Sequence, residues 1–294
     1  MIYKIIDGWQ KKAEATRVCR VLGISRSGWY AWRHCLKKQP SICSTTVQLK
    51  AAFAASGRSY GSRRLQATLN NQGINIGRYK VRKLMQQAQL KPVWQKKFVS
   101  TTDSKHDLPV AENKLNRQFN PVKPNCAWTS DITYIRTGTG WVYLAVVMDL
   151  FSRKIIGWAM DASMPAELVC RALTMAIAQR KPAAGLILHS DRGSQYASAA
   201  YQKLLQAHGI VCSMSRKGNC WDNAVMERFF LNLKMERVWQ QNYANHAEAI
   251  NDITEYIVGF YNCLRLHSTL GNVPPLIFEK NFAAKKPLAV SSIS

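Results

Sequence analysis

Hydrophobic residues follow two different patterns along the chain. Up to about residue 91 they recur every three or four positions, which is the spacing of amphipathic helices. From residue 126 they form short alternating or continuous runs that are typical of strands, with helical stretches between the later ones. Residues 92–125 separate the two regions and are basic, polar and without periodicity, as expected of a connector. The pattern predicts an all-α front part and an α/β back part.

Residues 11–35 contain two short predicted helices. Apolar positions at helical spacing end at Gly23, and Ser25 or Ser27 can cap a second helix that is rich in aromatic residues. Helix, glycine-containing turn and helix, with arginines nearby, favour a helix-turn-helix. Two short helices joined by a turn also occur as plain packing units, so this alternative stays open.

Residues 60–92 contain a second pair of predicted helices, separated by Gly73 and Gly77. Four basic residues crowd the start of the second helix, namely Arg78, Lys80, Arg82 and Lys83. A solvated basic face is the alternative, but residues 78–91 hold no acid and ordinary solvated helices mix the two signs. We expect a DNA-binding helix here, with Arg63 and Arg64 of the preceding helix as further DNA-contact candidates.

The back part begins with three strand patterns and continues with alternating helices and strands. The predicted strands of the opening meander are residues 126–135, 141–150 and 151–160. They are followed by a helix at 164–180, a strand at 185–191, a helix at 197–209, a strand at 210–215 and a long helix within 219–239. We expect Asp222 or Asn223 to cap that last helix. This order predicts a mixed sheet with crossover helices.

The charge is concentrated in the front part. The chain has 41 Lys and Arg against 17 Asp and Glu, a net charge of +24. Residues 1–125 hold 24 basic and five acidic residues, whereas residues 126–294 hold 17 and 12. An excess of this size favours a polyanionic partner, most simply nucleic acid, over a basic protein without one. A front part that grips phosphates and a back part that does chemistry would produce this division.

Cysteine spacing and hydropathy limit where in the cell the protein is expected to be located. None of the eight cysteines are spaced as C-x-x-C, so zinc-finger spacing is absent, and the chain is long for a disulfide scaffold. No segment reaches the roughly 18 uninterrupted apolar residues of a membrane span, and the N-terminus lacks a signal-peptide hydrophobic run. We expect reduced thiols in a cytoplasmic protein that does not bind membranes.

Three acids fall where the predicted elements could bring them together. Asp131 lies in the first strand, Asp191 directly follows the fourth, and Glu227 lies in the first turns of the long helix. Groups at strand ends meet at one edge of an α/β sheet. Acids held together repel unless a cation neutralises them, and Mg²⁺ binds carboxylates together with phosphate oxygens. Two such ions could serve phosphodiester displacement.

Each acid also has an ordinary explanation. Asp131 could be a solvent-facing strand residue, Asp191 before Arg-Gly could belong to a turn, and Glu227 could balance the helix dipole. Helical geometry adds that Lys234 lies within about 20° of the Glu227 face, two turns further along. Glu236 falls on the opposite face and is the poorer ligand candidate. Lys234 could hold a DNA phosphate or be a plain surface lysine.

The motifs SDITYI, VVMDLFSRKIIGW, HSDRGSQY, SMSRKGNCWDNAVMERFF and YN–R–H–LG occur in this order. Together they resemble the insertion-sequence-three family of DDE transposases, whose catalytic core is related to that of retroviral integrases. Between Asp191 and Glu227 lie 35 residues, as in the D-D-35-E pattern of that family. The resemblance extends over nearly the whole chain, because the front part is similar to the helix-turn-helix regions of the family.

The resemblance implies a ribonuclease-H-like catalytic core in which Asp131, Asp191 and Glu227 hold two Mg²⁺ or Mn²⁺ ions. It implies hydrolysis at the element ends to free a 3′-hydroxyl, which then attacks another phosphodiester. Lys234 matches the family's basic position that contacts DNA. Asn223 is expected to cap the helix and to help shape the site. Four later residues are candidates for a DNA-facing element, with core packing the alternative for the first: Tyr261, Asn262, Arg265 and His267.

The expected fold is α/β, a ribonuclease-H-like core with a mixed five-stranded sheet preceded by all-α helix-turn-helix regions. The expected division is a helix-turn-helix region at 1–40, a second basic one at 41–108, a linker at 109–124, the catalytic core at 125–282 and a flexible tail at 283–294. DNA is the expected partner, as terminal inverted repeats and as target, bound by a homo-oligomer. The family often fuses such a chain to an upstream-frame protein, so that polypeptide is a further expected partner. The alternative function is a DNA-binding regulator, derived from a transposase, without catalysis.

Overall fold

The structure, a computed structural model, describes residue 3 and residues 15–37, 44–93, 110–216 and 219–284. Residues 94–108 of the predicted second basic domain, residue 109 of the predicted linker and residues 285–294 of the predicted tail lie outside the described residues. The chain forms two compact units, Met1–Ala51 and Ala52–Ser294. The finer division expected from the sequence stays a prediction.

The first unit contains the helix pair predicted near the N-terminus. The helices are α2 (Ala15–Val21) and α3 (Arg26–Lys37). Gly23 in the turn between them has a φ of +63°, a left-handed conformation that glycine adopts without strain. Cys19 and Trp29 are buried and form the small core of this pair. Helix α4 (Ser44–Ala55) follows.

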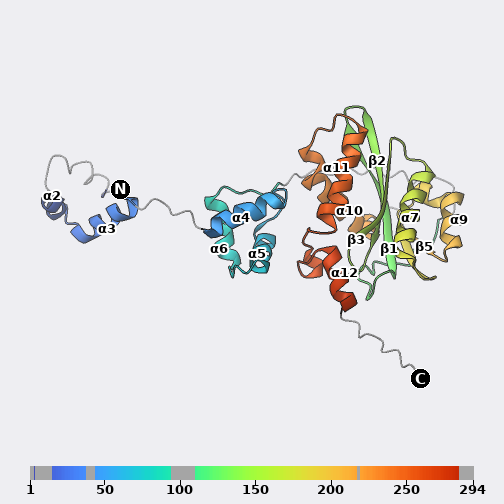
Figure 1. Cartoon of the computed structure of the whole chain (residues 1–294), viewed down its shortest axis with the longest axis horizontal. Helices are drawn as coiled ribbons and strands as arrows, with labels where there is room; N and C mark the ends of the chain where they lie inside the picture. Colours follow the sequence, from blue (N-terminus) through green and yellow to red (C-terminus); the bar gives the residue numbers. More distant parts are fainter. Residues whose placement is uncertain (1–2, 4–14, 38–43, 94–109, 217–218, 285–294) are drawn as a thin grey trace, which may run out of the picture. The chain divides into compact units, whose positions relative to one another are not determined.

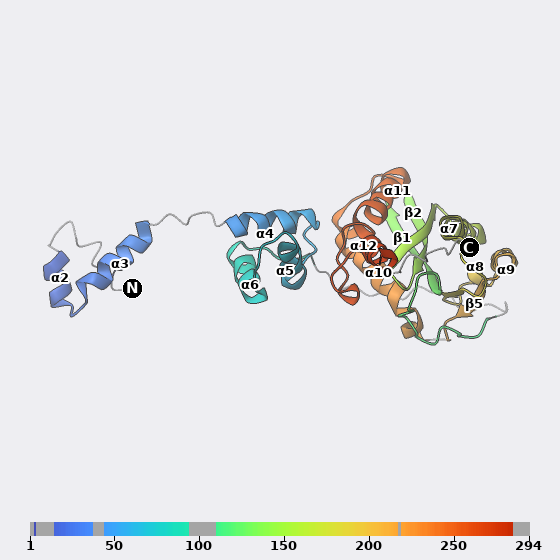
Figure 2. The same cartoon turned by 60° about the horizontal axis from the view of Figure 1, so that its bottom comes forward.

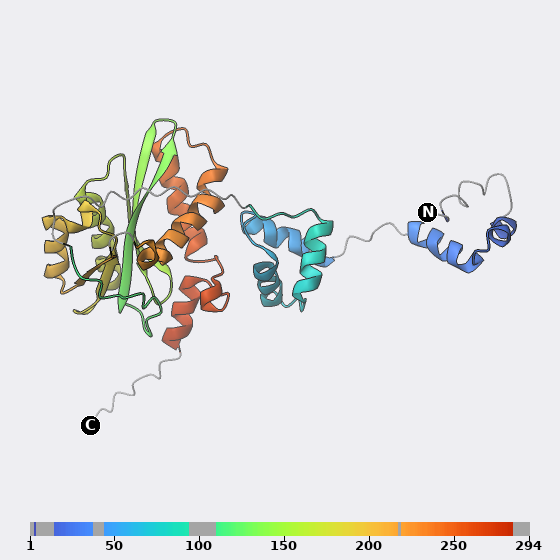
Figure 3. The same ribbon diagram turned by 180° about the vertical axis from the view of Figure 1, so that it is seen from behind.

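The second predicted helix pair is also present, as α5 (Ser62–Asn71) and α6 (Arg78–Gln87). Leu65 and Leu69 of α5 and Val81 and Met85 of α6 are buried, as the apolar spacing predicts. The basic side chains of α6 are excluded from that stripe and lie on its exposed surface. These helices are the blue-green elements of Figure 3.

A five-stranded mixed sheet forms the centre of the back part, with the strand order β3-β2-β1-β4-β5 (Figure 1). The strands are β1 (Ala127–Thr137), β2 (Gly140–Asp149), β3 (Lys154–Asp161), β4 (Ile187–Ser190) and β5 (Val211–Met214). The first three form an antiparallel meander, and β4 and β5 extend the sheet in parallel. The predicted mixed α/β core is confirmed.

Helices cover both faces of the sheet, so the core has three layers (Figures 1 and 2). One face packs against α7 (Ala166–Arg180), α8 (Ser194–Ala197) and α9 (Ala199–Ala207). The other packs against α10 (Ala224–Glu236), α11 (His246–Glu255) and a π-helical turn at Tyr256–Tyr261. The last described helix is α12 (Pro275–Ala284).

Alternation along the strands divides their side chains between the two layers. In β2, Ala145 and Val147 pack on the α7 side, whereas Leu144 and Val146 pack on the α10 side. Both sets are fully buried, which explains the near-continuous apolar run of this strand. In the part of the chain that the structure describes, no helix has the length and hydropathy to cross a membrane.

Candidate active site

The strand register brings Asp131 and Asp191 together. Strands β1 and β4 are parallel, and their last paired residues are Thr129 and His189. Asp131 lies two residues beyond Thr129 and Asp191 two residues beyond His189, so the same register places the two acids side by side where the strands separate. Asp131 and Ile135 are four positions apart on β1 and therefore share a face of that strand. Ile135 packs on the α10 side, so Asp131 points to that side as well.

Asp131 is half-buried, and both of its carboxylate oxygens accept hydrogen bonds. Oδ1 accepts from the backbone N–H of Ile132 at 2.8 Å, and Oδ2 accepts from Nδ2 of Asn223 at 2.8 Å. Burial raises the pKa of Asp131 well above its ordinary range, and the charges of Asp191 and Glu227 raise it further. The three predicted acids therefore lie near enough to one another to interact.

Asp191 and Glu227 contribute from two other elements. Asp191 directly follows β4, and its Oδ1 accepts a hydrogen bond from the backbone N–H of Gly193 at 2.9 Å. Glu227 lies in the first turn of α10 and is exposed. Partial desolvation raises its pKa. The arrangement combines the half-buried carboxylate of Asp131 with the exposed carboxylate of Glu227.

Lys234 lies on α10 beside this acidic group. Its side chain is half-buried, and burial lowers the pKa of its ammonium group while the charge of Asp131 raises it. The expectation that Lys234 shares a face with Glu227 agrees with this electrostatic contact to Asp131. Its contact with DNA stays a prediction.

The three acids are near neighbours, but their side chains are not arranged to coordinate one metal ion together. Across the described ranges, no three His, Cys, Asp or Glu side chains are placed closely enough to hold one metal ion together. Asp131 and Asp191 each accept a bond from a nearby backbone N–H instead. Their chemistry does suit Mg²⁺ or Mn²⁺, which prefer carboxylate oxygens, and a raised carboxylate pKa is what a bound cation would lower.

The loop before α10 is fixed by Asp222, which is buried. Its carboxylate accepts hydrogen bonds from Arg117 Nε at 2.8 Å, Asn113 Nδ2 at 2.9 Å and the backbone N–H of Arg216 at 3.0 Å. The segment before β1 and the loop after β5 are thus joined at one point. This junction holds in place the 3-10 turn Cys220–Asn223, from which α10 begins.

Asn223 occupies the N-cap position of α10, as one of the two predicted candidates, but its side chain makes no capping hydrogen bond. It extends instead to Asp131 and accepts a bond from the hydroxyl of Thr129. The sequence analysis singled out Asn223 as a cap that helps to shape the site, but it did not predict the bond to Asp131 or single out Thr129. The usable signal was the spacing of four residues between Asn223 and Glu227, which puts both on one side of the helix start.

His189 is buried and serves packing in the sheet. Its ring nitrogens lie 2.9 Å from Ser213 Oγ and 3.2 Å from Ser215 Oγ. Burial lowers the pKa of His189 to about 4. The four residues proposed for a later DNA-facing element are also buried, at 9% exposure or less, so that interpretation is wrong for their side chains: Tyr261, Asn262, Arg265 and His267.

The basic residues predicted to contact DNA divide into two groups. Five are exposed, namely Arg63 on α5 and Arg78, Lys80, Arg82 and Lys83 on α6. Arg64 is half-buried, and its guanidinium lies 3.9 Å from Glu236 Oε1. Exposure is compatible with DNA contact for the first group, and Arg64 already contacts an acid of the protein.

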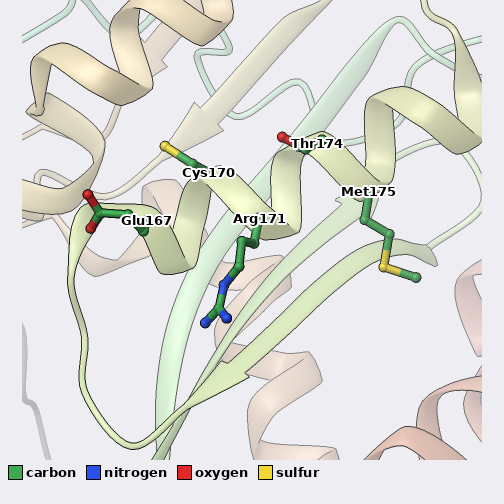
Figure 4. A pocket seen from close by; sticks show the side chains of 5 residues that line it. All are labelled: Glu167, Cys170, Arg171, Thr174 and Met175. Carbon is green, nitrogen blue, oxygen red and sulfur yellow. The ribbon is translucent and has the colours of Figure 1, made fainter.

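A shallow hollow on the surface lies apart from the acids (Figure 4). All five residues that line it belong to α7: Glu167, Cys170, Arg171, Thr174 and Met175. Figure 4 shows these five side chains at successive positions along α7, with Glu167 the one carboxylate among them. The hollow therefore adds nothing to the carboxylate site.

The sheet order, the helices on both faces and the position of the acids define an integrase-like core of the ribonuclease-H class. Residues 121–220 and 208–275 match two family models that are both described as integrase core domains. Residues 45–98 match a family model described as an HTH-like domain.

Relatives of known name agree with this class. The chain is 40% identical to the transposase InsF for insertion sequence IS3A of Escherichia coli (strain K12), over 96% of this chain and all of that protein. It is 43% identical to an uncharacterized 31 kDa protein of insertion element IS600 of Shigella sonnei, over 90% of this chain and 98% of that one. The chain belongs to the IS3 family of DDE-type transposases, which are polynucleotidyl transferases. As a transposase it acts on DNA.

A solved structure gives a more distant likeness. The HTLV-2 integrase catalytic core domain in complex with magnesium aligns with a TM-score of 0.44 and 18% identity, over 54% of this chain and 99% of that one. The family assignment does not depend on this alignment.

Proposed function

We propose that the protein cleaves DNA strands at the ends of its insertion element and transfers them to target DNA. Asp131, Asp191 and Glu227 are the proposed catalytic residues and the ligands of two divalent ions, Mg²⁺ or Mn²⁺. The observation that carries this proposal is the β1–β4 register, which sets Asp131 beside Asp191 under the start of α10.

Bound divalent ions would supply an activated attacking oxygen and a stabilised leaving oxygen. The residues of the chain provide the rest of the arrangement. Asp131 is fixed by two hydrogen bonds, and Glu227 can approach it from the exposed side. Lys234 supplies a positive charge beside the acids, where it would hold a DNA phosphate.

The front part would bind the element ends. Its exposed basic helix α6 suits phosphate contacts, which supply most of the affinity of DNA-binding proteins and position them on the duplex. We propose that terminal inverted repeats and target DNA are the substrates and that a homo-oligomer joins two ends. The upstream-frame polypeptide is a proposed further partner. The proposed location is the cytoplasm, at the nucleoid when bound to DNA.

The test is strand cleavage by the full chain on DNA that carries the element end, with Mg²⁺ or Mn²⁺, beside Glu227→Gln. We expect nicks at the 3′ ends with the parent protein and none with the variant, while both bind the DNA equally. Nicks at equal frequency on unrelated DNA would indicate a general nuclease. Binding without nicks in any divalent metal, even after the fused upstream polypeptide is added, would indicate a DNA-binding regulator instead.

A further inference from the structure

Asn223 connects the start of α10 to β1. It is 7% exposed and lies where the 3-10 turn passes into α10. Both ends of its amide group are engaged: Oδ1 accepts from Thr129 Oγ1 at 3.2 Å, and Nδ2 donates to Asp131 Oδ2 at 2.8 Å. Thr129 and Asp131 are two residues apart on β1, so they present their side chains to Asn223 from the same face of that strand.

The chemistry of these groups fixes which way the amide points. A carboxylate can only accept hydrogen bonds, whereas a hydroxyl can donate or accept. If the amide were reversed, Oδ1 of Asn223 would face Oδ2 of Asp131 and two acceptors would be in contact. In its ionised form, which is the form that binds a cation, Asp131 therefore selects the observed orientation, and Thr129 completes it by donating.

The bond to Asn223 leaves the carboxylate of Asp131 able to bind a cation. One hydrogen bond reaches each oxygen, from Ile132 N–H and from Asn223 Nδ2. An ionised carboxylate has about four lone-pair directions, so each oxygen keeps one for a further ligand. The two hydrogen bonds thereby fix the plane of the carboxylate and leave a position on each oxygen free for a cation.

The same residue also sets where Glu227 lies. Asn223 precedes Glu227 by four residues, about one helical turn, so the two side chains lie within roughly 40° of each other around the helix. A bond from Asn223 to Asp131 thus holds the first turn of α10 against β1 on the side that carries Glu227. No other described side chain links Asp131 to that turn by a hydrogen bond.

We propose that Asn223 is a positioning residue of the carboxylate site. It orients Asp131 and fixes the distance between Asp131 and Glu227, and Thr129 holds the amide of Asn223 in the required direction. This inference rests on the proposed function, because it assigns Asn223 a role toward the ions that the three acids would bind. Groups that hydrogen-bond to a metal ligand fix its orientation, and losing one typically costs about 10- to 100-fold in metal affinity or activity.

The test measures Mn²⁺ binding to the full chain without DNA, by isothermal titration calorimetry. Asn223→Ala is expected to weaken Mn²⁺ binding about 10- to 100-fold and to raise the Mn²⁺ concentration needed for half-maximal cleavage in parallel. The matched control is Asn245→Ala. Asn245 also starts a helix, α11, where its side chain accepts a bond from the backbone N–H of Glu248, and it does not bond to the acids. Asn245→Ala is expected to bind Mn²⁺ like the parent.

A second variant keeps the inference testable if Asn223→Ala fails to fold. Thr129→Val keeps the shape of the side chain and removes only the hydroxyl that orients the amide, so we expect a smaller loss of Mn²⁺ affinity in the same direction. Urea unfolding in EDTA identifies which variants are folded. If Asn223→Ala is folded and binds Mn²⁺ as tightly as the parent, the role of Asn223 is overturned. If Asn223→Ala is unfolded, parental Mn²⁺ affinity in Thr129→Val overturns it.

The parent and an Asp131→Asn variant separate this inference from the proposed function. If the parent binds no Mn²⁺, or if Asp131→Asn binds it like the parent, the proposed carboxylate site itself fails and the role of Asn223 fails with it. If the parent binds, Asp131→Asn does not, and Asn223→Ala matches the parent, only the inference about Asn223 is overturned.

Discussion

The ammonium group of Lys234 lies 4.9 Å from the centre of the Tyr134 ring. Tyr134 is three residues after Asp131 on β1, and its ring meets that of Trp141 edge to face at 5.0 Å. An aromatic face attracts a cation, so Tyr134 holds the charge of Lys234 at the strand that carries Asp131. The positive charge beside the acids is therefore placed by a specific contact rather than left to a mobile surface side chain.

Lys234→Ala is expected to weaken DNA binding by a similar factor on all sequences and to reduce the slope of log affinity against log salt by about one. The physical reason is the loss of one phosphate contact and of the counterion that it releases. Fluorescence anisotropy over a series of salt concentrations measures both quantities. Lys203→Ala, which removes an exposed lysine of α9, is the control and should leave the slope unchanged. Equal slopes for Lys234→Ala and the parent would contradict a phosphate contact.

Asp131→Asn is expected to raise the melting temperature at neutral pH in EDTA. Burial and the charge of Asp191 raise the pKa of Asp131, so the folded protein holds its proton more tightly than the unfolded chain does. The stability that this group contributes is then present below the ordinary Asp pKa of about 3.9 and is lost as pH rises through the raised pKa. Above that range the ionised group destabilises the fold, and asparagine removes the charge.

Differential scanning calorimetry across pH checks this expectation, with about 2–4 °C for each kcal/mol relieved in a chain of this size. The advantage of Asp131→Asn should shrink as pH falls toward the ordinary Asp pKa. Saturating Mn²⁺ should reverse the order, since an ion that binds only the folded parent stabilises it. A variant that melts below the parent at every pH in EDTA would show that Asp131 does not destabilise the fold.

Local patterns were sufficient to predict the sheet and the helices that alternate with it. The buried residues of β2 and α7 are the ones that the apolar pattern of each segment marks. Each element could therefore be predicted without knowing what it packs against. No helix or strand was predicted after residue 240, although α11 and the π-helical turn Tyr256–Tyr261 cover one face of the sheet. The position of α11 and the π-helical turn depends on the apolar face of the sheet, whose residues lie far away in the sequence.

In the candidate site, too, the sequence predicted what depends on neighbouring residues and not what depends on residues far apart in the chain. Asp131, Asp191 and Glu227 could be selected because each lies at a recognisable point of a predicted element. The bond from Asn223 to Asp131 joins residues 92 positions apart and follows from how α10 packs on β1. Capping propensity favours Asn at a helix start, and here a buried carboxylate offers that side chain a charged acceptor instead.

Glu236→Gln is expected to destabilise the protein by about 3–5 kcal/mol, because it leaves a buried cation without its counter-charge. Arg265 is 1% exposed and bonds to Glu236 through Nη2 at 2.7 Å and Nε at 2.8 Å. Tyr256 donates a further bond to Glu236 at 2.7 Å. Urea unfolding measures the loss. Asp161→Asn is the control, since its pair with Arg171 is exposed and should contribute far less. Equal losses would mean that the burial of Arg265 does not matter.

Gly157→Ala is expected to destabilise the protein by about 1–3 kcal/mol or more, through overpacking. Gly157 lies in β3 under α7, and a Cβ there would clash with Ala172 O and would meet Ala176 N at 2.8 Å. These are backbone atoms of a helix, so they cannot yield as a flexible side chain does, and α7 would have to move off the sheet. Urea unfolding checks the loss. Gly61→Ala is the matched control, because a Cβ at Gly61 meets nothing within 4 Å and its φ is negative. If both variants unfold at the parental urea concentration, α7 does not pack on β3 as closely as described.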